Sequence, residues 1–459
     1  MSRFDEINEL IAKMQEAPTL AKERLEKLFD ENSFVELGAF NTDAGVVTGY
    51  GTIRGKLVYA FSQEGAVNTK HANKIANVYT LALKMGCPVV AVMDSKGVAI
   101  EDGFGTFDAY GVMFKSQAAA SGVIPQISIV LGNCLGVSTF LPTLSDFVIM
   151  PKENAKMFLL SPSVYAGLDG KASTYETVGG AEALSQKGLV HFECENDAQC
   201  FERVQELIEL LPANNLDDYS VAAVTDDLNR TDESLNSIVP EDNTTEIDMK
   251  AIITSVADNF RFTEVSANYA PNIISGFIRL DGITTGVIAN VGNIDIDAVK
   301  KAGEFVNICD AFNIPLVTFT DVEGYSNLHI DAQSDVIKYS AKLAFAFANA
   351  TVPKINVVVR NGIGNAYLIM NSKHIGADIV YAWPSADIAL LSKKAATKVL
   401  GLNEKYYSEI STPYQIAADG YIDGVIIPAN TRKRILIALE MLLTKRENTV
   451  AKKHASIEF

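Results

Sequence analysis

Cysteine and histidine are scarce in this chain, and their placement excludes two classes of site. The 459 residues include five cysteines and five histidines. No Cys-x-x-Cys pair occurs, so neither a disulfide framework nor a structural zinc site is expected. This cysteine usage fits a reducing, cytosolic compartment. The residues are Cys87, Cys134, Cys194, Cys200 and Cys309, with His71, His191, His329, His374 and His454.

Basic residues are in the minority. Lys and Arg total 39 against 56 Asp and Glu, which gives a net charge of −17. A field this negative excludes nucleic acid as an expected partner. Any anionic ligand must then be held by local hydrogen-bond donors against the field of the whole chain.

The chain also lacks an apolar run suited to a membrane span. Its uncharged stretch, residues 116–145, is interrupted by Pro125, Gly132 and Gly136, whereas a spanning helix needs about 20 predominantly apolar residues. Residues 1–6 carry charge from the start, unlike a secretory signal. We predict no transmembrane segment and a cytoplasmic protein.

Signatures of side-chain catalysis are missing too. There is no G-x-S-x-G elbow and no Walker loop. Gly103-Phe104-Gly105 begins like a dinucleotide loop but lacks the rest of it. Lys84-Met85 is similar to part of a biotin attachment site, but it falls at the end of a predicted helix that Gly86 closes. We interpret both motifs as structural.

What the chain does contain is an internal repeat. Val46-Val47-Thr48-Gly49-Tyr50 corresponds to Ile273-Ile274-Ser275-Gly276-Phe277. The offset is 227 at Gly49, Gly55, Pro88, Asp94 and Gly97, and 228 at Phe34, Pro125 and Gly136. A near-constant offset over about 100 residues indicates an ancient duplication into two like domains, not a short-period solenoid.

Each copy predicts the same order of elements. Two strands meet at a tight turn, and a helix follows, over Asn73–Met85 in one copy and Asp297–Phe312 in the other. An apolar strand, a second helix and another apolar strand come next, which indicates βαβ crossovers and an α/β fold. The stretch from Leu211 to Asp248 holds ten acids and one base and is interpreted as the connector. We therefore place the domains at 1–225 and 226–459. Amphipathic helices are expected at both ends, the first through Phe4, Ile7, Leu10, Ile11 and Met14.

In both copies a buried strand runs into a glycine turn and then a helix start. These segments are Leu131–Ser138 and Arg360–Tyr367. Backbone N–H groups at a helix start point outward with partial positive charge, so such a turn can stabilise an oxyanion. A single turn of this kind is more often only a turn. Two at equivalent positions of a duplicated chain put the functional interpretation on a par with the structural one.

These residues belong to a longer set of motifs, and the whole chain resembles the carboxyltransferase subunits of biotin-dependent acyl-CoA carboxylases and decarboxylases. The nearest resemblance is to the group of propionyl-CoA carboxylase β and methylmalonyl-CoA decarboxylase α subunits. The motifs include Ala21-Lys22-Glu23-Arg24-Leu25, Val47-Thr48-Gly49-Tyr50-Gly51, Ala120-Ser121-Gly122-Val123-Ile124-Pro125-Gln126-Ile127, Cys309-Asp310-Ala311-Phe312-Asn313-Ile314-Pro315 and Ser372-Lys373-His374-Ile375-Gly376-Ala377-Asp378.

The resemblance implies two tandem crotonase-like (ClpP/crotonase) domains, with an acyl-CoA side at the N-terminus and a biotin side at the C-terminus. It implies a coenzyme A thioester as substrate and biotin on a partner carrier protein. Other implied partners are a biotin carboxylase subunit or membrane decarboxylase subunits, in a homodimer to homohexamer, cytoplasmic or peripheral to a membrane complex. Amides near Gly136, Val137 and Ser138 would hold the thioester enolate, and those of Asn365 and Ala366 the biotin ureido oxygen.

The departures from the family pattern fall at the expected substrate-binding residues. Lys96 replaces a glycine in Asp94-Ser95-Lys96-Gly97-Val98-Ala99, and the turn Gly364-Asn365-Ala366-Tyr367-Leu368 has Leu368 where the family has Asp. Lys96 is expected to bind a phosphate or carboxylate, or else to be a solvated loop lysine. Gly97, Val98, Gly364, Tyr367 and Leu368 complete the expected substrate-binding set, with Tyr367 also a candidate core residue. Asp94 and Asp321 are expected to cap helices or tie down the turns that follow.

The residues leave three functions open. The first is carboxyl transfer with biotin-bearing partners, in the direction of decarboxylating a malonyl- or methylmalonyl-type CoA. The second is a biotin-independent crotonase-fold decarboxylase or hydrolase, for which Ser138 is a nucleophile without an assignable base. The third is a non-catalytic assembly subunit in which the altered turns no longer bind acyl-CoA.

Overall fold

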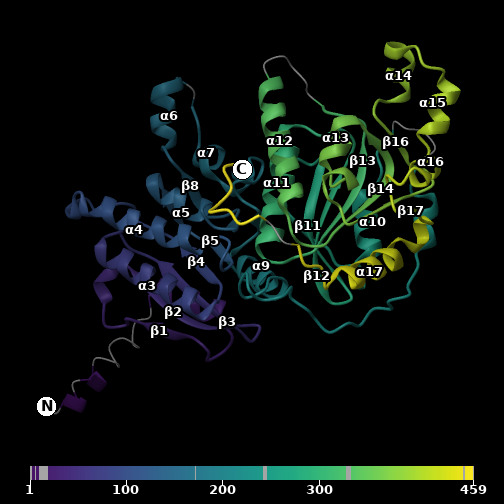
Figure 1. Ribbon diagram of the computed structural model, residues 1–459. Helices are drawn as coiled ribbons and strands as arrows, with labels where there is room; N and C mark the ends of the chain where they lie inside the picture. The colour runs from purple at the N-terminus through teal and green to yellow at the C-terminus, as the bar shows by residue number, and fades with distance from the viewer. Residues whose placement is uncertain are drawn as a thin grey trace. The chain divides into compact units, whose positions relative to one another are not determined.

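The computed structural model describes residues 3–5, 7–9, 19–170, 172–240, 245–326, 332–447 and 450–457. The chain divides into two compact units, Met1–Asp217 (unit 1) and Asp218–Phe459 (unit 2), which are treated one at a time (Figure 1). The division lies before the 225/226 boundary placed from the sequence, and Val221 forms a bridge with Ile283 inside unit 2. Leu10, Ile11 and Met14 of the expected N-terminal helix lie outside the described residues.

Unit 1 is built on a seven-stranded sheet in the order β1-β2-β3-β4-β5-β7-β9. The β1, β2 and β3 strands pair antiparallel, and the rest pair parallel. A second, two-stranded sheet joins β6 and β8. The strands are β1 Val35–Leu37, β2 Val46–Ile53, β3 Lys56–Gln63, β4 Val89–Met93, β5 Gln126–Val130, β6 Asn133–Leu135, β7 Phe147–Pro151, β8 Lys156–Phe158 and β9 Phe192–Cys194.

The helices of unit 1 follow the capping chemistry of the sequence. The Asn68 side chain accepts from the His71 amide, so α3 begins at Thr69, four residues before the start expected from the sequence. It ends at Met85, where Gly86 adopts φ +62°. The helices are α2 Leu20–Leu28, α3 Thr69–Met85, α4 Gly105–Ala120, α5 Phe140–Thr143, α6 Pro162–Asp169, α7 Tyr175–Gly179, α8 Ala181–Ser185 and α9 Asp197–Leu210, with 3-10 turns η1 Thr42–Ala44, η2 Ile100–Asp102 and η3 Gly136–Thr139.

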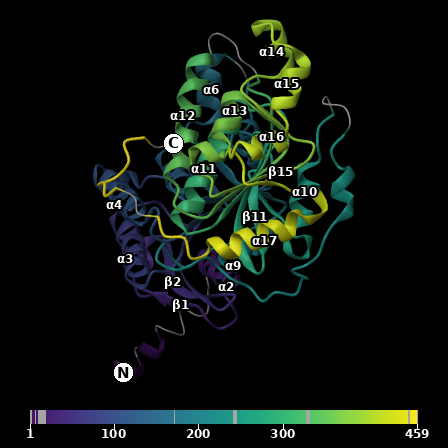
Figure 2. The same ribbon diagram turned by 45° about the vertical axis from the view of Figure 1, so that its right-hand side comes forward.

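Unit 2 repeats this topology, with strand order β10-β11-β12-β13-β14-β15-β17 and β16 paired to β14. The α11 and α12 helices lie side by side in both views (Figures 1 and 2). The strands are β10 Thr263–Val265, β11 Ile273–Leu280, β12 Ile283–Asn290, β13 Leu316–Val322, β14 Lys354–Ile363, β15 Ile379–Ala382, β16 Asp387–Ala389 and β17 Gly424–Val425. The helices are α10 Met249–Val256, α11 Ile296–Ala311, α12 Gln333–Asn349, α13 Gly364–Ile369, α14 Lys393–Leu400, α15 Glu404–Ile410, α16 Pro413–Ala418 and α17 Thr431–Leu442.

The duplication holds at the level of single contacts. In unit 1, Glu36 pairs opposite Gly49 and forms an ion pair with Lys22 at 3.6 Å. In unit 2, Glu264 pairs opposite Gly276 and forms an ion pair with Lys250 at 2.7 Å. Each pair of counterparts is separated by the offset of the sequence repeat, so the two units share register as well as topology.

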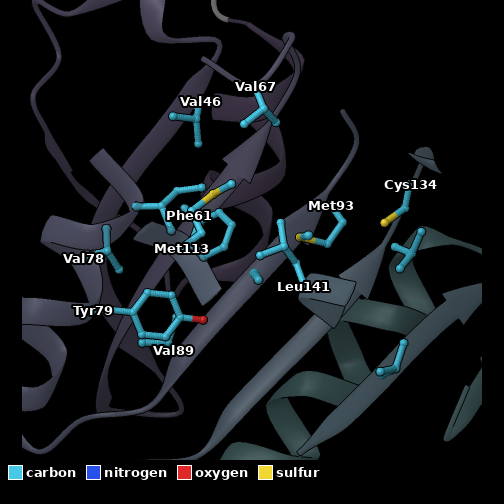
Figure 3. Close-up of a cluster of buried hydrophobic side chains, with 14 of the residues drawn as sticks. Val46, Phe61, Val67, Val78, Tyr79, Val89, Met93, Met113, Cys134 and Leu141 are labelled. Carbon is cyan, nitrogen blue, oxygen red and sulfur yellow. The ribbon is translucent and has the colours of Figure 1, made fainter. Parts of the chain in front are cut away.

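Each unit has its own apolar core. The core of unit 1 lies between the sheet and the α3–α4 pair, and its buried side chains include residues of β2, β3, β4 and both helices (Figure 3). In Figure 3, Phe61, Val78, Tyr79, Val89 and Met113 lie close together. The separate core of unit 2 includes Trp383. Among the described residues, no helix is both long and apolar enough to cross a membrane.

Candidate active site

The glycine turn of unit 1 lies where β6 ends. Gly136 adopts φ +59° and starts the 3-10 turn Gly136–Thr139. In a 3-10 turn the first N–H groups, here those of Gly136 and Val137, have no acceptor within the turn. A Cβ placed on Gly136 would meet nothing within 4 Å. The turn therefore presents backbone donors beside open space.

The turn of unit 2 occupies the equivalent position at the end of β14. Gly364 adopts φ +63° and starts α13, so the N–H groups of Asn365 and Ala366 have no acceptor within the helix. A Cβ on Gly364 would lie 3.2 Å from the Leu390 carbonyl oxygen. The left-handed dihedral angle favours glycine here, and a Cβ would also force the Leu390 carbonyl to shift by a few tenths of an ångström.

The structure places the other residues expected in unit 1 around its turn. Val137 packs partly against the apolar core. Ser138 is fully buried, and its hydroxyl pairs with the phenol of Tyr110 instead of a base. Lys96 is exposed, and Val98 forms a bridge with Val67.

The loop that carries Lys96, Gly97 and Val98 lies beside the turn. The Ser95 amide donates to the Asn133 carbonyl at 2.8 Å, and Gly97 has φ +87°. The structure therefore brings these two sequence-predicted segments of unit 1 together.

Within unit 2, the expected residues share α13 but face different surroundings. Leu368 is 39% exposed, whereas Tyr367 is buried with its ring against Gly362. The Tyr367 hydroxyl has no hydrogen-bond partner among the described residues, and burial raises the pKa of this phenol. Tyr367 is thus a core residue of the turn.

A carboxylate holds the strand that leads into each turn. In unit 1, Asp94 accepts from the Asn133 amide at 3.1 Å and from Arg24 Nη1 at 2.8 Å. We call these three residues the unit 1 clamp. The aspartate ties down the turn after the neighbouring strand, which differs from the expected role in the turn that directly follows it.

The unit 2 clamp consists of Asp321, Arg360 and Asn361. Asp321 accepts from the Asn361 amide at 2.9 Å and from Arg360 at 2.7 and 3.2 Å. Asp94 and Asn133 lie at the repeat offset from Asp321 and Asn361, so the internal repeat could have revealed that these two residues are equivalent. The repeat could not have revealed the arginines, because they come from different elements, α2 in unit 1 and β14 in unit 2.

The Cys134 thiol, beside the unit 1 turn, is not set up as a nucleophile. Burial raises the pKa of Cys134 to about 12, so its thiol stays protonated near neutral pH. Among the described residues, no group of three or more His, Cys, Asp and Glu side chains could hold a metal ion, and His329 lies outside them. The chemistry available at both turns is therefore that of neutral backbone donors in partly apolar surroundings.

Comparison with known proteins agrees with this geometry. The family model of the carboxyl transferase domain matches residues 12–457. The chain is 42% identical to methylmalonyl-CoA decarboxylase subunit alpha of Veillonella parvula, over 95% of this chain and 92% of the relative. It is 38% identical to the propionyl-CoA carboxylase beta chain of Roseobacter denitrificans, over 95% and 93% of the two chains.

A solved structure shows the same fold. The crystal structure of transcarboxylase 12S with hydrolysed methylmalonyl-coenzyme A bound matches with a TM-score of 0.92 and 38% identity. The match covers 97% of this chain and 94% of that one. The expected tandem crotonase-like α/β architecture is confirmed, and the chain belongs to the carboxyl transferase family, whose reaction class is carboxyl transfer.

Proposed function

We propose that this enzyme moves a carboxyl group between biotin on a carrier protein and the α-carbon of an acyl-CoA thioester. The observation that carries the proposal is the pair of equivalent left-handed glycine turns, each with free backbone donors and each held by an aspartate. Both reactants contain a carbonyl oxygen that gains negative charge as the carboxyl group leaves or arrives. Fixed N–H donors stabilise such an oxygen.

In unit 1, the amides of Gly136 and Val137 would bind the thioester oxygen, with Ser138 completing the turn. Negative charge grows on this oxygen when the α-carbon loses its carboxylate and an enolate forms. The open space beside Gly136 gives the oxygen room to approach, and the exposed Lys96 ammonium lies on the adjoining loop to attract an anionic part of the ligand. Gly97 and Val98 would form the wall between them.

In unit 2, the amides of Asn365 and Ala366 would hold the ureido oxygen of biotin. The donors fit such a group, because neutral N–H groups flanked by the apolar Leu368 suit a neutral cyclic urea. Gly364 keeps the backbone close enough for contact. Biotin, when bound, supplies or accepts the carboxyl group, and the residues of this chain bind it and orient it. Tyr367 supports the turn from the core.

The names of the relatives favour a substrate class and a direction. A methylmalonyl-CoA decarboxylase subunit and a transcarboxylase structure with hydrolysed methylmalonyl-coenzyme A both point to malonyl-type CoA esters. We therefore propose decarboxylation of a malonyl- or methylmalonyl-type CoA by a cytoplasmic enzyme.

The same relatives indicate the assembly. One is described as a hexamer in a multienzyme core, and another as the alpha subunit of a decarboxylase. We propose a homo-oligomer, from dimer to hexamer, that works with a separate biotin carrier protein. A biotin carboxylase subunit or membrane decarboxylase subunits would complete the complex.

The test is loss of carboxylate from malonyl-CoA and methylmalonyl-CoA by the purified chain, with and without free biotin. We expect turnover that depends on biotin. The Gly136→Ala variant should lower it, because alanine at φ +59° is strained and shifts the donors. Gly111 lies in α4, where an added Cβ meets nothing within 4 Å, so Gly111→Ala is the matched control with unchanged turnover.

Other outcomes would support other functions. Equal turnover without biotin, unaffected by avidin, would indicate a biotin-independent decarboxylase or hydrolase. No turnover together with no binding of CoA esters by a stable oligomer would indicate an assembly subunit. Either result would refute the proposal.

A further inference from the structure

The hydroxyl of Tyr110 links two segments of the unit 1 site. Tyr110 lies on α4 and is 2% exposed. Its Oη lies 2.5 Å from Ser138 Oγ in the glycine turn. Ser95, in the loop that carries Lys96, lies close enough to this phenol to lower its pKa against the effect of burial.

The link extends to the backbone of that loop. The Gly97 amide donates to Ser95 Oγ at 3.0 Å. Ser95 therefore lies between the backbone of the loop and the phenol, and Tyr110 in turn pairs with Ser138 of the glycine turn. The buried phenol is thus close to both segments.

The phenol is held firmly and stays neutral. The Tyr110 ring packs against Phe114 with centroids 6.0 Å apart, and Phe114 packs against Phe140 at 6.2 Å. Burial raises the pKa of Tyr110, so the hydroxyl keeps its proton and can donate it in a hydrogen bond near neutral pH. These contacts suit a fixed spacer between two segments and do not suit a base.

The duplication provides an internal comparison. The position of Ser138 corresponds to Ala366 in unit 2, which has no hydroxyl. That turn is held by the unit 2 clamp, whose Asn361 side chain also donates to Asp321 at 2.9 Å. Among the described contacts of unit 1, Asn133 donates to Asp94 through its backbone amide and not through its side-chain amide. The contact between Tyr110 and Ser138 is therefore specific to the turn of unit 1.

We propose that Tyr110 is a positioning residue for carboxyl transfer. It would set the spacing between the amides of Gly136 and Val137 and the loop that carries Lys96. The inference rests on the proposed function of this turn, and it adds a residue that touches no substrate. Its loss should slow the chemical step without weakening substrate binding.

The experiment compares Tyr110→Phe with Tyr79→Phe. Tyr79 is also a buried phenol of unit 1, and it lies on α3 in the apolar core. For malonyl-CoA decarboxylation with free biotin, we expect Y110F to lower kcat about tenfold with KM changed less than about twofold. This loss is below the 10²–10³ of deleting an oxyanion donor, because the donors remain. Y79F should keep the wild-type kcat.

Ser138→Ala tests whether the hydroxyl acts through the turn. It should lower kcat to the same extent, and the Y110F/S138A double variant should be no slower than either single variant. Three results would each overturn the inference. The kcat losses of the single variants could multiply in the double variant, Y110F and Y79F could lose kcat equally, or Y110F could show no loss of kcat.

Hydrogen exchange separates this inference from the proposed function. A peptide covering residues 133–140 should exchange faster in Y110F than in wild type, and at the wild-type rate in Y79F. Unchanged exchange in Y110F refutes the positioning role even if the wild-type protein decarboxylates neither ester. Inactivity of the wild type would refute the proposed function, and faster exchange in Y110F alone would still support the role of Tyr110 in holding the turn.

Discussion

The two clamps allow a prediction to be made twice within one chain. Each joins an aspartate to an arginine, but their exposure differs. The Asp321 and Arg360 side chains are 3% and 7% exposed, whereas those of Asp94 and Arg24 are 24% and 8% exposed. Removing one partner of a fully buried ion pair leaves the other charge buried and unpaired. Where the site is partly exposed, water can enter and solvate the remaining charge.

We expect Asp321→Ala to cost about 3–5 kcal/mol in the free energy of unfolding, because the Arg360 guanidinium stays buried without its carboxylate. Asp94→Ala should cost about 1–3 kcal/mol, the range for losing hydrogen bonds to a charged group that water partly replaces. The difference between two equivalent substitutions is therefore set by solvent access.

The chain carries its own probe for unit 2. Trp383 is the single tryptophan of the sequence, is fully buried, and donates its indole N–H to Thr431. Urea unfolding followed by tryptophan emission should show the loss in Asp321→Ala. Asp94→Ala should instead move the transition measured by far-ultraviolet circular dichroism. Glu440→Ala, an exposed acid on α17, is the control and should stay within about 0.5 kcal/mol of wild type.

A double-mutant cycle tests the cause. Arg360→Met and Asp321→Ala should each destabilise unit 2, and the double variant should lose at least about 2 kcal/mol less than the sum of the single losses. Additive losses would refute the reasoning, as would equal losses in Asp321→Ala and Asp94→Ala. Either result would mean that the pairing of charge is not what stabilises the clamps.

Three further predictions concern single side chains. Gly136→Ala should lower stability by about 1–2 kcal/mol through its left-handed backbone, whereas Gly111→Ala should raise it by up to about 1 kcal/mol through helix propensity, both by thermal unfolding. Burial raises the pKa of the Asp146 carboxyl from 3.8 to about 7. Between these two pKa values the folded state binds a proton that the unfolded state has lost. Wild-type stability therefore falls as pH rises from about 4 through 7. Asp146→Asn should be the more stable protein at pH 8, by up to about 4 kcal/mol. Equal pH profiles would contradict this assignment. Lys354 donates to the Phe347 and Ala350 carbonyls at 2.7 and 2.8 Å, so Lys354→Met should destabilise the end of α12 by about 1–3 kcal/mol, seen as faster amide exchange there.

The repeat made most of the fold accessible from sequence. Gly49, Pro88 and Gly136 lie at nearly the same offset from their counterparts in the second half. Because glycine and proline mark turns, this constant spacing indicates two copies of one topology. The family resemblance follows from the same positions. The expected start of α3 was placed from apolar periodicity. The true start at Thr69 was missed because it is set by the polar cap Asn68, which does not take part in that periodicity.

The candidate site was accessible only in part. The glycine turns follow local rules, so Gly136 and Gly364 could be found from the strand-to-helix pattern. Tyr110 and Arg24 could not be found, because their contacts lie 28 and 70 residues away and depend on how helices pack on the sheet. No local signal separates such a side chain from an ordinary core tyrosine or a helix arginine.

The arginines of the two clamps come from positions that are not equivalent in the repeat. Arg24 corresponds to Ile252 at the repeat offset, and Arg360 corresponds to Gly132. Gly132 lies so close to Asp94 that a Cβ there would be 2.1 Å from the carboxylate, so an arginine cannot occupy that position in unit 1 as it stands. The aspartate and the asparagine are common to both halves, whereas the arginine comes from a different element in each. The two halves therefore meet one structural requirement with unrelated solutions, and each can be altered without changing the other.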